Sequence, residues 1–216
     1  MKTLLPTVLV IALAACSQQA PTPVATPPAP EVTKEPPSKT ILGLTLSEQV
    51  QLEECEKERS HGSIYYATFP ANAPCWKPYF TSGTLTMKSQ SMPNEGSIAI
   101  VVAGSMAPSG IDNVVEAQLV EGRAESIKLE TLGTDQQEDI LRLLTEKWGK
   151  ATSSSIENLQ NGFGARFEGV EAYWAFDDFS VHYFGMLNRE KGIILIKSKM
   201  LADKEALSRP VRAESL

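Results

Sequence analysis

Apolar and polar residues alternate in short runs along most of the chain, and this two-residue period predicts strands rather than helices. The runs lie at 41–46, 63–69, 84–89, 97–103, 113–120, 124–130, 164–169, 171–176, 179–184 and 192–198. The runs at 113–120 and 124–130 are joined by Glu121-Gly122-Arg123, a sequence typical of a tight hairpin. Because turns this short connect neighbouring strands, the pattern favours antiparallel meanders.

Two stretches carry helix signals instead. Residues 134–149 place apolar side chains at helical spacing, with Thr134 and Gln137 arranged as a capping box and Gly149 after the last turn. Residues 47–59 begin with a serine in the N-cap position and carry acidic residues early and basic residues late, as the helix dipole favours. Both stretches are therefore predicted to be helical.

The order of elements is a helix followed by strands, twice over, and it predicts an α+β domain. We expect antiparallel meander sheets with helices packed on one face. The domain spans 41–216, and a duplicated unit would divide it into 41–131 and 132–200. One continuous sheet and two separate sheets both fit the pattern. The C-terminal tail from Met200 is expected to begin with a short helix.

The first fifteen residues have the layout of an export signal. Lys2 precedes an apolar run of about twelve residues, shorter than the roughly 20 that span a bilayer, so 1–15 is predicted to be a signal peptide. The run ends Leu13-Ala14-Ala15-Cys16, which resembles the lipobox of bacterial lipoproteins. This resemblance implies cleavage before Cys16, a diacylglycerol on its sulfur and an acyl chain such as palmitate on the new amine. An ordinary signal peptide with an incidental cysteine is the alternative.

Ser17 and the proline-rich segment after it suggest in which membrane the protein is anchored and how its domain is linked to that anchor. Ser17 in that position implies, by resemblance to enterobacterial lipoproteins, the outer membrane with the domain facing the periplasm. Residues 16–40 hold seven of the chain's 14 prolines and no apolar period, so they cannot fold on their own. A proline-rich tether of this length reaches roughly 75 Å at most. The alternative is an ordered arm packed on the domain.

The net charge limits the classes of molecule that the domain could bind, and the cysteine content suggests a disulfide. The formal net charge of −6 argues against nucleic acid and against electrostatic docking on anionic lipid, so membrane contact is expected through the anchor alone. With Cys16 lipidated, Cys55 and Cys75 remain as a pair in an oxidising compartment. A disulfide between them would add roughly 3 kcal/mol of stability. Two free thiols are the alternative.

The two helix openings and the residues after the second helix resemble a known class of small periplasmic lipoproteins. Ser47-Glu48-Gln49 parallels Thr134-Asp135-Gln136, and LLTEKWGKATSS at 143–154 leads into a meander. These features are similar to outer-membrane assembly lipoproteins of the SmpA/OmlA type, and the tandem order is similar to the β-lactamase-inhibitor protein fold. Gly133 matches the glycine that precedes the helix in such units, whereas Ala151 replaces their proline. The resemblance implies a binding role.

Residue types suited to catalysis or metal binding do not form a recognisable motif. His61 and His182 have no cysteine or histidine at zinc-ligand spacing, and no G-x-S-x-G elbow is present. Asp177-Asp178 lies between two strand runs and is typical of a hairpin turn. We therefore predict no catalytic residue, no metal site and no cofactor.

The aromatic residues near the C-terminal strands are the candidate partner-binding set. They are Tyr173, Trp174, Phe176, Tyr183 and Phe184. Alternation places most of them in the core and the remainder on a sheet face that a partner could contact. The sequence thus predicts a lipid-anchored, non-catalytic binding or adaptor module for an unidentified periplasmic or envelope protein. A periplasmic inhibitor of a hydrolase of the lysozyme or β-lactamase type, and an enzyme with a cryptic site, are the alternatives.

Overall fold

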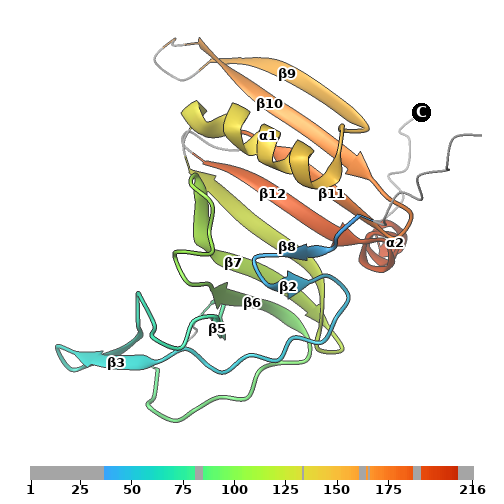
Figure 1. Cartoon of the computed structure of the whole chain (residues 1–216). Helices are drawn as coiled ribbons and strands as arrows, with labels where there is room; N and C mark the ends of the chain where they lie inside the picture. Colours follow the sequence, from blue (N-terminus) through green and yellow to red (C-terminus); the bar gives the residue numbers. More distant parts are fainter. Residues whose placement is uncertain are drawn as a thin grey trace, which may run out of the picture. The chain divides into compact units, whose positions relative to one another are not determined.

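Eight strands form one antiparallel sheet in the order β5-β6-β7-β8-β12-β11-β10-β9 (Figure 1). The computed structural model describes residues 37–80, 85–132, 134–160, 164, 166–186 and 191–208. The strands are β5 (Cys75–Pro78), β6 (Gly96–Val101), β7 (Ile111–Val120), β8 (Arg123–Leu132), β9 (Ser153–Gln160), β10 (Arg166–Ala175), β11 (Phe179–Phe184) and β12 (Lys191–Ser198). The predicted antiparallel meanders are confirmed. Strands before and after residue 132 share one sheet, because β8 pairs with β12.

The remaining elements are short. Two small hairpins are formed by β1 (Thr40–Ile41) with β2 (Leu44–Thr45) and by β3 (Lys57–Ser60) with β4 (Ser63–Tyr66). The helical elements are the 3₁₀ turn η1 (Thr134–Gln136), α1 (Gln137–Trp148) and α2 (Lys199–Ser208). Neither α-helix in the described part of the chain is long and apolar enough to cross a membrane.

Helix α1 packs on one face of the sheet (Figure 1). Its buried stripe includes Ile140, Leu144 and Trp148, which join the core cluster formed by alternate strand residues such as Trp174 and Ile194. This is the stripe that the sequence predicts. The helix ends as predicted at Gly149, which has a φ of 78° and donates its N–H to the Thr145 carbonyl at 2.8 Å.

Helix α2 contacts β12 and β8 and buries Leu201. Its Glu205 pairs with Lys197 at 2.7 Å. Ile194 and Ile196 of β12 lie in the core on the α1 side, so alternation places Lys197 on the opposite face. The α+β class therefore holds at a coarse level, with strands dominating, whereas the expectation that the helices pack on one face is not confirmed.

The predicted helix at 47–59 is wrong. Ser47 has a φ of 64°, and its N–H donates to the Ala124 carbonyl at 2.8 Å. The N–H of Val50 likewise donates to the Gly122 carbonyl at 3.0 Å. These donors bond to the distant β7–β8 hairpin, so the stretch runs as an extended arm rather than closing helical turns.

Several strand boundaries also differ from the predictions. The run at 41–46 folds back on itself, because Leu42 and Gly43 have positive φ values and separate β1 from β2. The runs at 164–169 and 171–176 are one strand, β10, and no strand forms at 85–89. Strands β3, β5 and β9 are additions that alternation does not reveal.

The predicted capping box does not form, because the Gln137 side chain has other partners. Its Nε2 donates to the Glu168 carbonyl at 3.0 Å, and its Oε1 accepts the Val170 N–H at 2.9 Å. The side chain is buried and fastens the first turn of α1 to the backbone of β10.

Candidate binding face

The face of the sheet opposite α1 carries aromatic and polar side chains along β9, β10 and β11, and α2, the other described α-helix, contacts β12 and β8. Tyr173 lies opposite His182, and Glu171 lies opposite Phe184. Directly opposed residues of an antiparallel pair share a face. The intervening residues of these strands lie in the core, so these four side chains lie on the other side. We call Glu171, Tyr173, His182 and Phe184 the open face.

His182 is held in place within the open face by three neighbours. Its Nε2 lies 2.6 Å from Glu171 Oε1, and the two side chains are 31% and 36% exposed. Its ring centroid lies 3.8 Å from that of Phe184, and Tyr173 meets it edge-on at 5.5 Å. The half-exposed imidazole therefore has a fixed orientation against a carboxylate and two aromatic rings.

A surface hollow of ≈ 430 Å³ lies against the open face. Its lining includes Glu171, Tyr173 and His182, together with the serines of β9 at 153–155. Ser153 lies opposite Tyr173 and Ser155 lies opposite Glu171, so both serines share the open face. The hollow thus combines hydroxyl groups, a carboxylate and an aromatic wall.

Paired charges occupy the next part of this face. Lys128 forms an ion pair with Glu116, and its Nζ lies 3.4 Å from the Tyr79 hydroxyl. Burial lowers the pKa of Lys128, but Glu116 and Tyr79 outweigh burial, and the net effect raises that pKa. Because Lys128 and Glu116 neutralise each other, this region does not give the open face an electrostatic potential of one sign.

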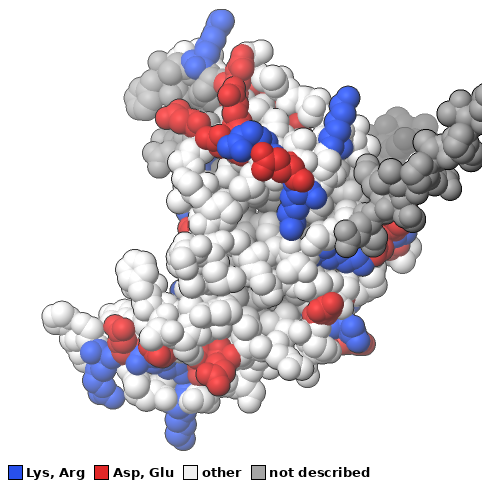
Figure 2. Space-filling view, viewed as in Figure 1, with Lys and Arg blue, Asp and Glu red and all other residues white. Residues whose placement is uncertain are grey.

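Mixed charge is also found on the side covered by α1. Figure 2 shows side chains of both signs over α1 and near β3, with uncharged surface between them. On α1, Arg142 bonds Asp139 at 2.9 Å and Glu146 at 3.1 Å. This helix surface is therefore internally paired.

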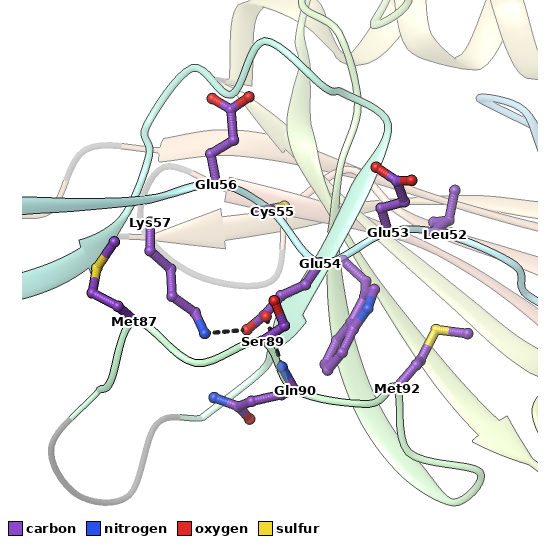
Figure 3. A pocket seen from close by; sticks show the side chains of 11 residues that line it. Leu52, Glu53, Glu54, Cys55, Glu56, Lys57, Met87, Ser89, Gln90 and Met92 are labelled. Atoms are coloured by element: carbon purple, nitrogen blue, oxygen red, sulfur yellow. Dashed lines mark hydrogen bonds and ion pairs between the residues drawn. The ribbon is translucent and has the colours of Figure 1, made fainter.

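A second hollow, of ≈ 470 Å³, lies beside β5 (Figure 3). Beside it Glu54 accepts hydrogen bonds from Lys57 Nζ at 2.7 Å, the Tyr66 hydroxyl at 2.7 Å and the Gln90 N–H at 2.8 Å. The Lys57 and Glu54 side chains are only 4% and 9% exposed. We call these four residues the Glu54 cluster.

The Glu54 cluster stabilises the fold rather than forming a reactive site. Burial raises the pKa of Glu54, but the hydrogen bonds from Lys57, Tyr66 and Gln90 outweigh it and lower that pKa overall. Burial and the Glu54 carboxylate raise the pKa of the Tyr66 hydroxyl. Both carboxylate oxygens are occupied, so the cluster ties the β3–β4 hairpin and the segment at 85–92 to the arm.

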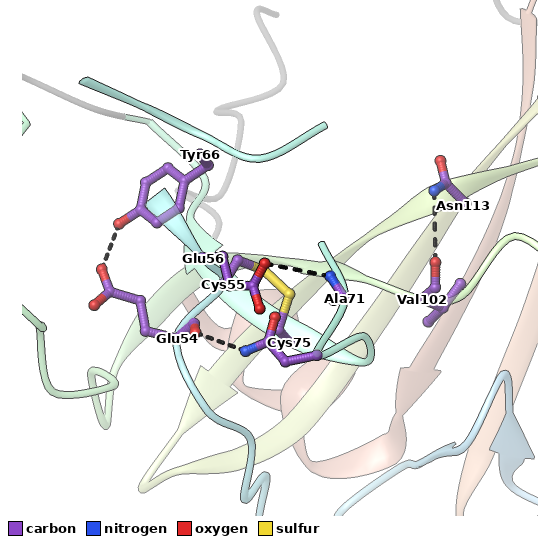
Figure 4. The surroundings of a disulfide bond; sticks show 9 residues. Glu54, Cys55, Glu56, Tyr66, Ala71, Cys75, Val102 and Asn113 are labelled. Atoms are coloured by element: carbon purple, nitrogen blue, oxygen red, sulfur yellow. Dashed lines mark hydrogen bonds between the residues drawn. A yellow bond between two sulfur atoms is a disulfide. The ribbon is translucent and has the colours of Figure 1, made fainter. Parts of the chain in front are cut away.

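The predicted disulfide is confirmed at the same edge of the sheet (Figure 4). Cys55 and Cys75 are bonded, with their Cα atoms 4.9 Å apart, and both are buried against Val101. The bond joins the arm to β5. Asn72 adds a hydrogen bond from its Nδ2 to the Glu54 carbonyl at 3.1 Å.

The five candidate partner-binding residues divide between the two faces. Trp174 and Tyr183 are 1% and 0% exposed in the core, where no partner could reach them. Phe176 is half-buried and stacks on Phe179 at 4.4 Å. Tyr173 and Phe184 lie on the open face, as alternation predicts.

Other sequence candidates fall outside this face. The signal peptide, Cys16 and the tether up to residue 36 lie outside the described residues. Asp177-Asp178 forms the β10–β11 turn, where Asp178 pairs with Lys39. His61 lies in the β3–β4 turn beside Ser60. Among the residues that the structure describes, no group of three or more potential ligands could hold a metal ion.

Sequence reasoning missed Glu171 and the serines of β9 as members of the candidate site. Glu171 lies two residues from Tyr173 in the same strand, so alternation alone could have placed it on the same face. Ser153 and Ser155 carry no such signal, since β9 is exposed on both sides.

No family model, no curated protein and no solved structure matches this chain.

Proposed function

We propose that this chain is a lipid-anchored protein of the bacterial envelope whose domain binds another envelope protein through the open face, without catalysing a reaction. The observation that supports this proposal is the uncovered set of Tyr173, His182 and Phe184 around Glu171. Aromatic side chains with fixed orientation supply contact area at low entropic cost, which is why they dominate protein-binding surfaces. Relationship to the SmpA/OmlA-type lipoproteins is part of the same proposal.

The open face suits binding better than hydrolysis. A nucleophilic serine needs a base within hydrogen-bond reach, about 3 Å. Ser153 is separated from His182 by the strand that carries Tyr173, and two strand spacings amount to roughly 10 Å. The His182 Nε2 atom is already engaged by Glu171. This arrangement favours recognition of a polar partner group by the imidazole and carboxylate.

The binding proposal is tested by crosslinking the full-length protein in its native envelope and identifying the captured proteins by mass spectrometry. We expect one envelope protein to dominate the capture and to be lost from the double variant Tyr173→Ala/Phe184→Ala. The matched control is Tyr65→Ala/Phe69→Ala, because these side chains are 55% and 86% exposed on another part of the domain. Capture that is equal in both double variants, or that yields no dominant protein, contradicts the proposal. Capture of a soluble hydrolase would favour an inhibitor instead.

The anchor is tested separately. We propose that Cys16 carries the lipid and that the domain faces the periplasm from the outer membrane, on the basis of the lipobox and Ser17. Cells fed an alkyne analogue of palmitate should label the protein, and Cys16→Ser should remove the label and release the protein from membranes. Equal labelling of Cys16→Ser would show that the lipid is elsewhere.

A further inference from the structure

The two edges of the eight-stranded sheet differ in how they are closed. At β5 the arm covers the edge, because Cys55 donates its N–H to the Trp76 carbonyl at 2.8 Å and Trp76 donates to the Glu53 carbonyl at 2.9 Å. At the other end, no strand or bridge within the described ranges pairs with the outer side of β9. β9 is therefore the edge that the described residues leave unpaired.

The hydrogen-bond pattern shows which backbone groups of β9 point outward. Between β10 and β11, Gly185 donates to the Val170 carbonyl at 2.7 Å, and Phe176 donates to the Phe179 carbonyl at 3.0 Å. Even-numbered residues of β10 thus bond β11, so odd-numbered ones such as Glu171 bond β9. Since Glu171 lies opposite Ser155, the odd-numbered residues of β9 bond β10 in return.

The remaining residues of β9 direct their backbone N–H and C=O groups away from the sheet. They are Ser154, Ile156, Asn158 and Gln160. Edge strands are commonly protected by lysine, proline or a bulge. β9 (Ser153–Gln160) contains no lysine, arginine or proline and pairs with β10 in unbroken register. Its single charge is Glu157, and its Ile156 is 63% exposed.

We propose that β9 pairs antiparallel with β9 of a second copy of this chain, about a two-fold axis at Ile156. In this register Ile156 faces Ile156 of the second copy, and Ser154 faces Asn158, so the outward groups of these three residues form hydrogen-bonded pairs. Shifting the register by two residues would place Glu157 opposite Glu157, a like-charge pair that destabilises a ladder. The register centred on Ile156 therefore avoids a like-charge pair and places the two exposed isoleucine side chains against each other.

The dimer has a consequence for the open face. In the proposed register Ser155 lies opposite Glu157 of the second copy, and Ser153 lies opposite Leu159. Ser153 and Ser155 line the hollow beside Tyr173, so the second copy would extend that hollow with a carboxylate and an apolar side chain. This inference does not depend on the proposed envelope partner, because the dimer forms from this chain alone.

The first test measures the mass of the full-length protein over a concentration series by sedimentation. We expect a concentration-dependent dimer that Ile156→Pro abolishes. Proline removes the outward N–H while sparing the bonds to β10, since Ile156 does not direct its N–H to β10. Ile156→Val is the matched control and should still dimerise. A monomer at every concentration, or a dimer that survives Ile156→Pro, overturns the proposal.

The second test does not require the proline variant to fold. In a Cys16→Ser background, oxidation of Ile156→Cys should crosslink two chains, because hydrogen-bonded pairs place Cα atoms about 5.5 Å apart, within disulfide range. Ser154→Cys alone should not crosslink, whereas its mixture with Asn158→Cys should. Efficient crosslinking of Ser154→Cys with itself, or none of Ile156→Cys, overturns the register and with it the proposed dimer.

Discussion

The Glu54 cluster offers a sharp test of how this domain is held together. Replacing Glu54 by glutamine removes the charge that neutralises Lys57, whose side chain is 4% exposed. Lys57 then keeps the Lys88 carbonyl at 2.6 Å and the Tyr66 ring, whose centroid lies 5.5 Å from Nζ, but has no opposite charge beside it. Removing one member of a buried ion pair costs about 3–5 kcal/mol, because the other charge stays buried without compensation. Glutamine can still accept one hydrogen bond, so we expect a loss of about 3 kcal/mol.

The effect of this substitution should depend on pH. The hydrogen bonds to Glu54 outweigh burial and lower its pKa below the 4.5 of a free glutamate. A lowered folded-state pKa gives stability that is fully present above pH 4.5 and is lost as the pH falls through the folded-state pKa. The difference in unfolding free energy between the parent and Glu54→Gln should therefore be largest near neutral pH and shrink in acid.

Urea denaturation followed by circular dichroism, at neutral pH and at several acidic values, measures both expectations. Glu53→Gln is the matched control, because Glu53 is exposed and should change stability by less than about 0.5 kcal/mol. Combining Glu54→Gln with Lys57→Met should cost less than the sum of the two single changes, by at least about 1 kcal/mol. Equal effects of Glu54→Gln and Glu53→Gln, or a difference that does not vary with pH, would refute the reasoning.

Three further substitutions test other contacts that stabilise the fold, and urea denaturation measures the change in unfolding free energy for each. Replacing Cys55 and Cys75 together by alanine should cost about 3 kcal/mol through the entropy of the opened loop, and an unchanged midpoint would contradict this. Gln137→Ala should cost about 1–3 kcal/mol, because the Val170 N–H loses its acceptor. Trp148→Phe should cost more than about 1 kcal/mol, because it removes the hydrogen bond from Nε1 to the Ser38 carbonyl at 2.9 Å and also leaves a cavity in the core.

Sequence reasoning succeeded where a strand has one buried face. In β11 the predicted alternation matches the structure residue by residue, with Phe179, Val181 and Tyr183 buried and the intervening residues half-exposed. Strand β9 failed for the opposite reason. Nearly all of its residues are exposed, so neither face leaves a period in the sequence.

The arm at 47–59 failed because its contacts are distant along the chain. A serine start, early acidic residues and late basic residues are local signals, and a helix satisfies all of them. In the structure the Glu54 carboxylate instead accepts hydrogen bonds from Tyr66 and Gln90, which lie 12 and 36 residues away along the chain. Partners at such separations cannot be read from periodicity, and the disulfide was the single long-range contact that the cysteine count could predict.

The structural fastenings and the proposed binding surfaces lie at opposite edges of the sheet. The disulfide joins the arm to β5 and the Glu54 cluster lies beside it, whereas the open face and the unpaired edge belong to β9, β10 and β11. Five strands lie between β5 and β10 in the sheet. Changes at sites this far apart, with no shared partners, add independently. Loss of the disulfide should therefore lower stability without altering what the open face binds, and its stability cost should simply add to that of changes at Tyr173 and Phe184.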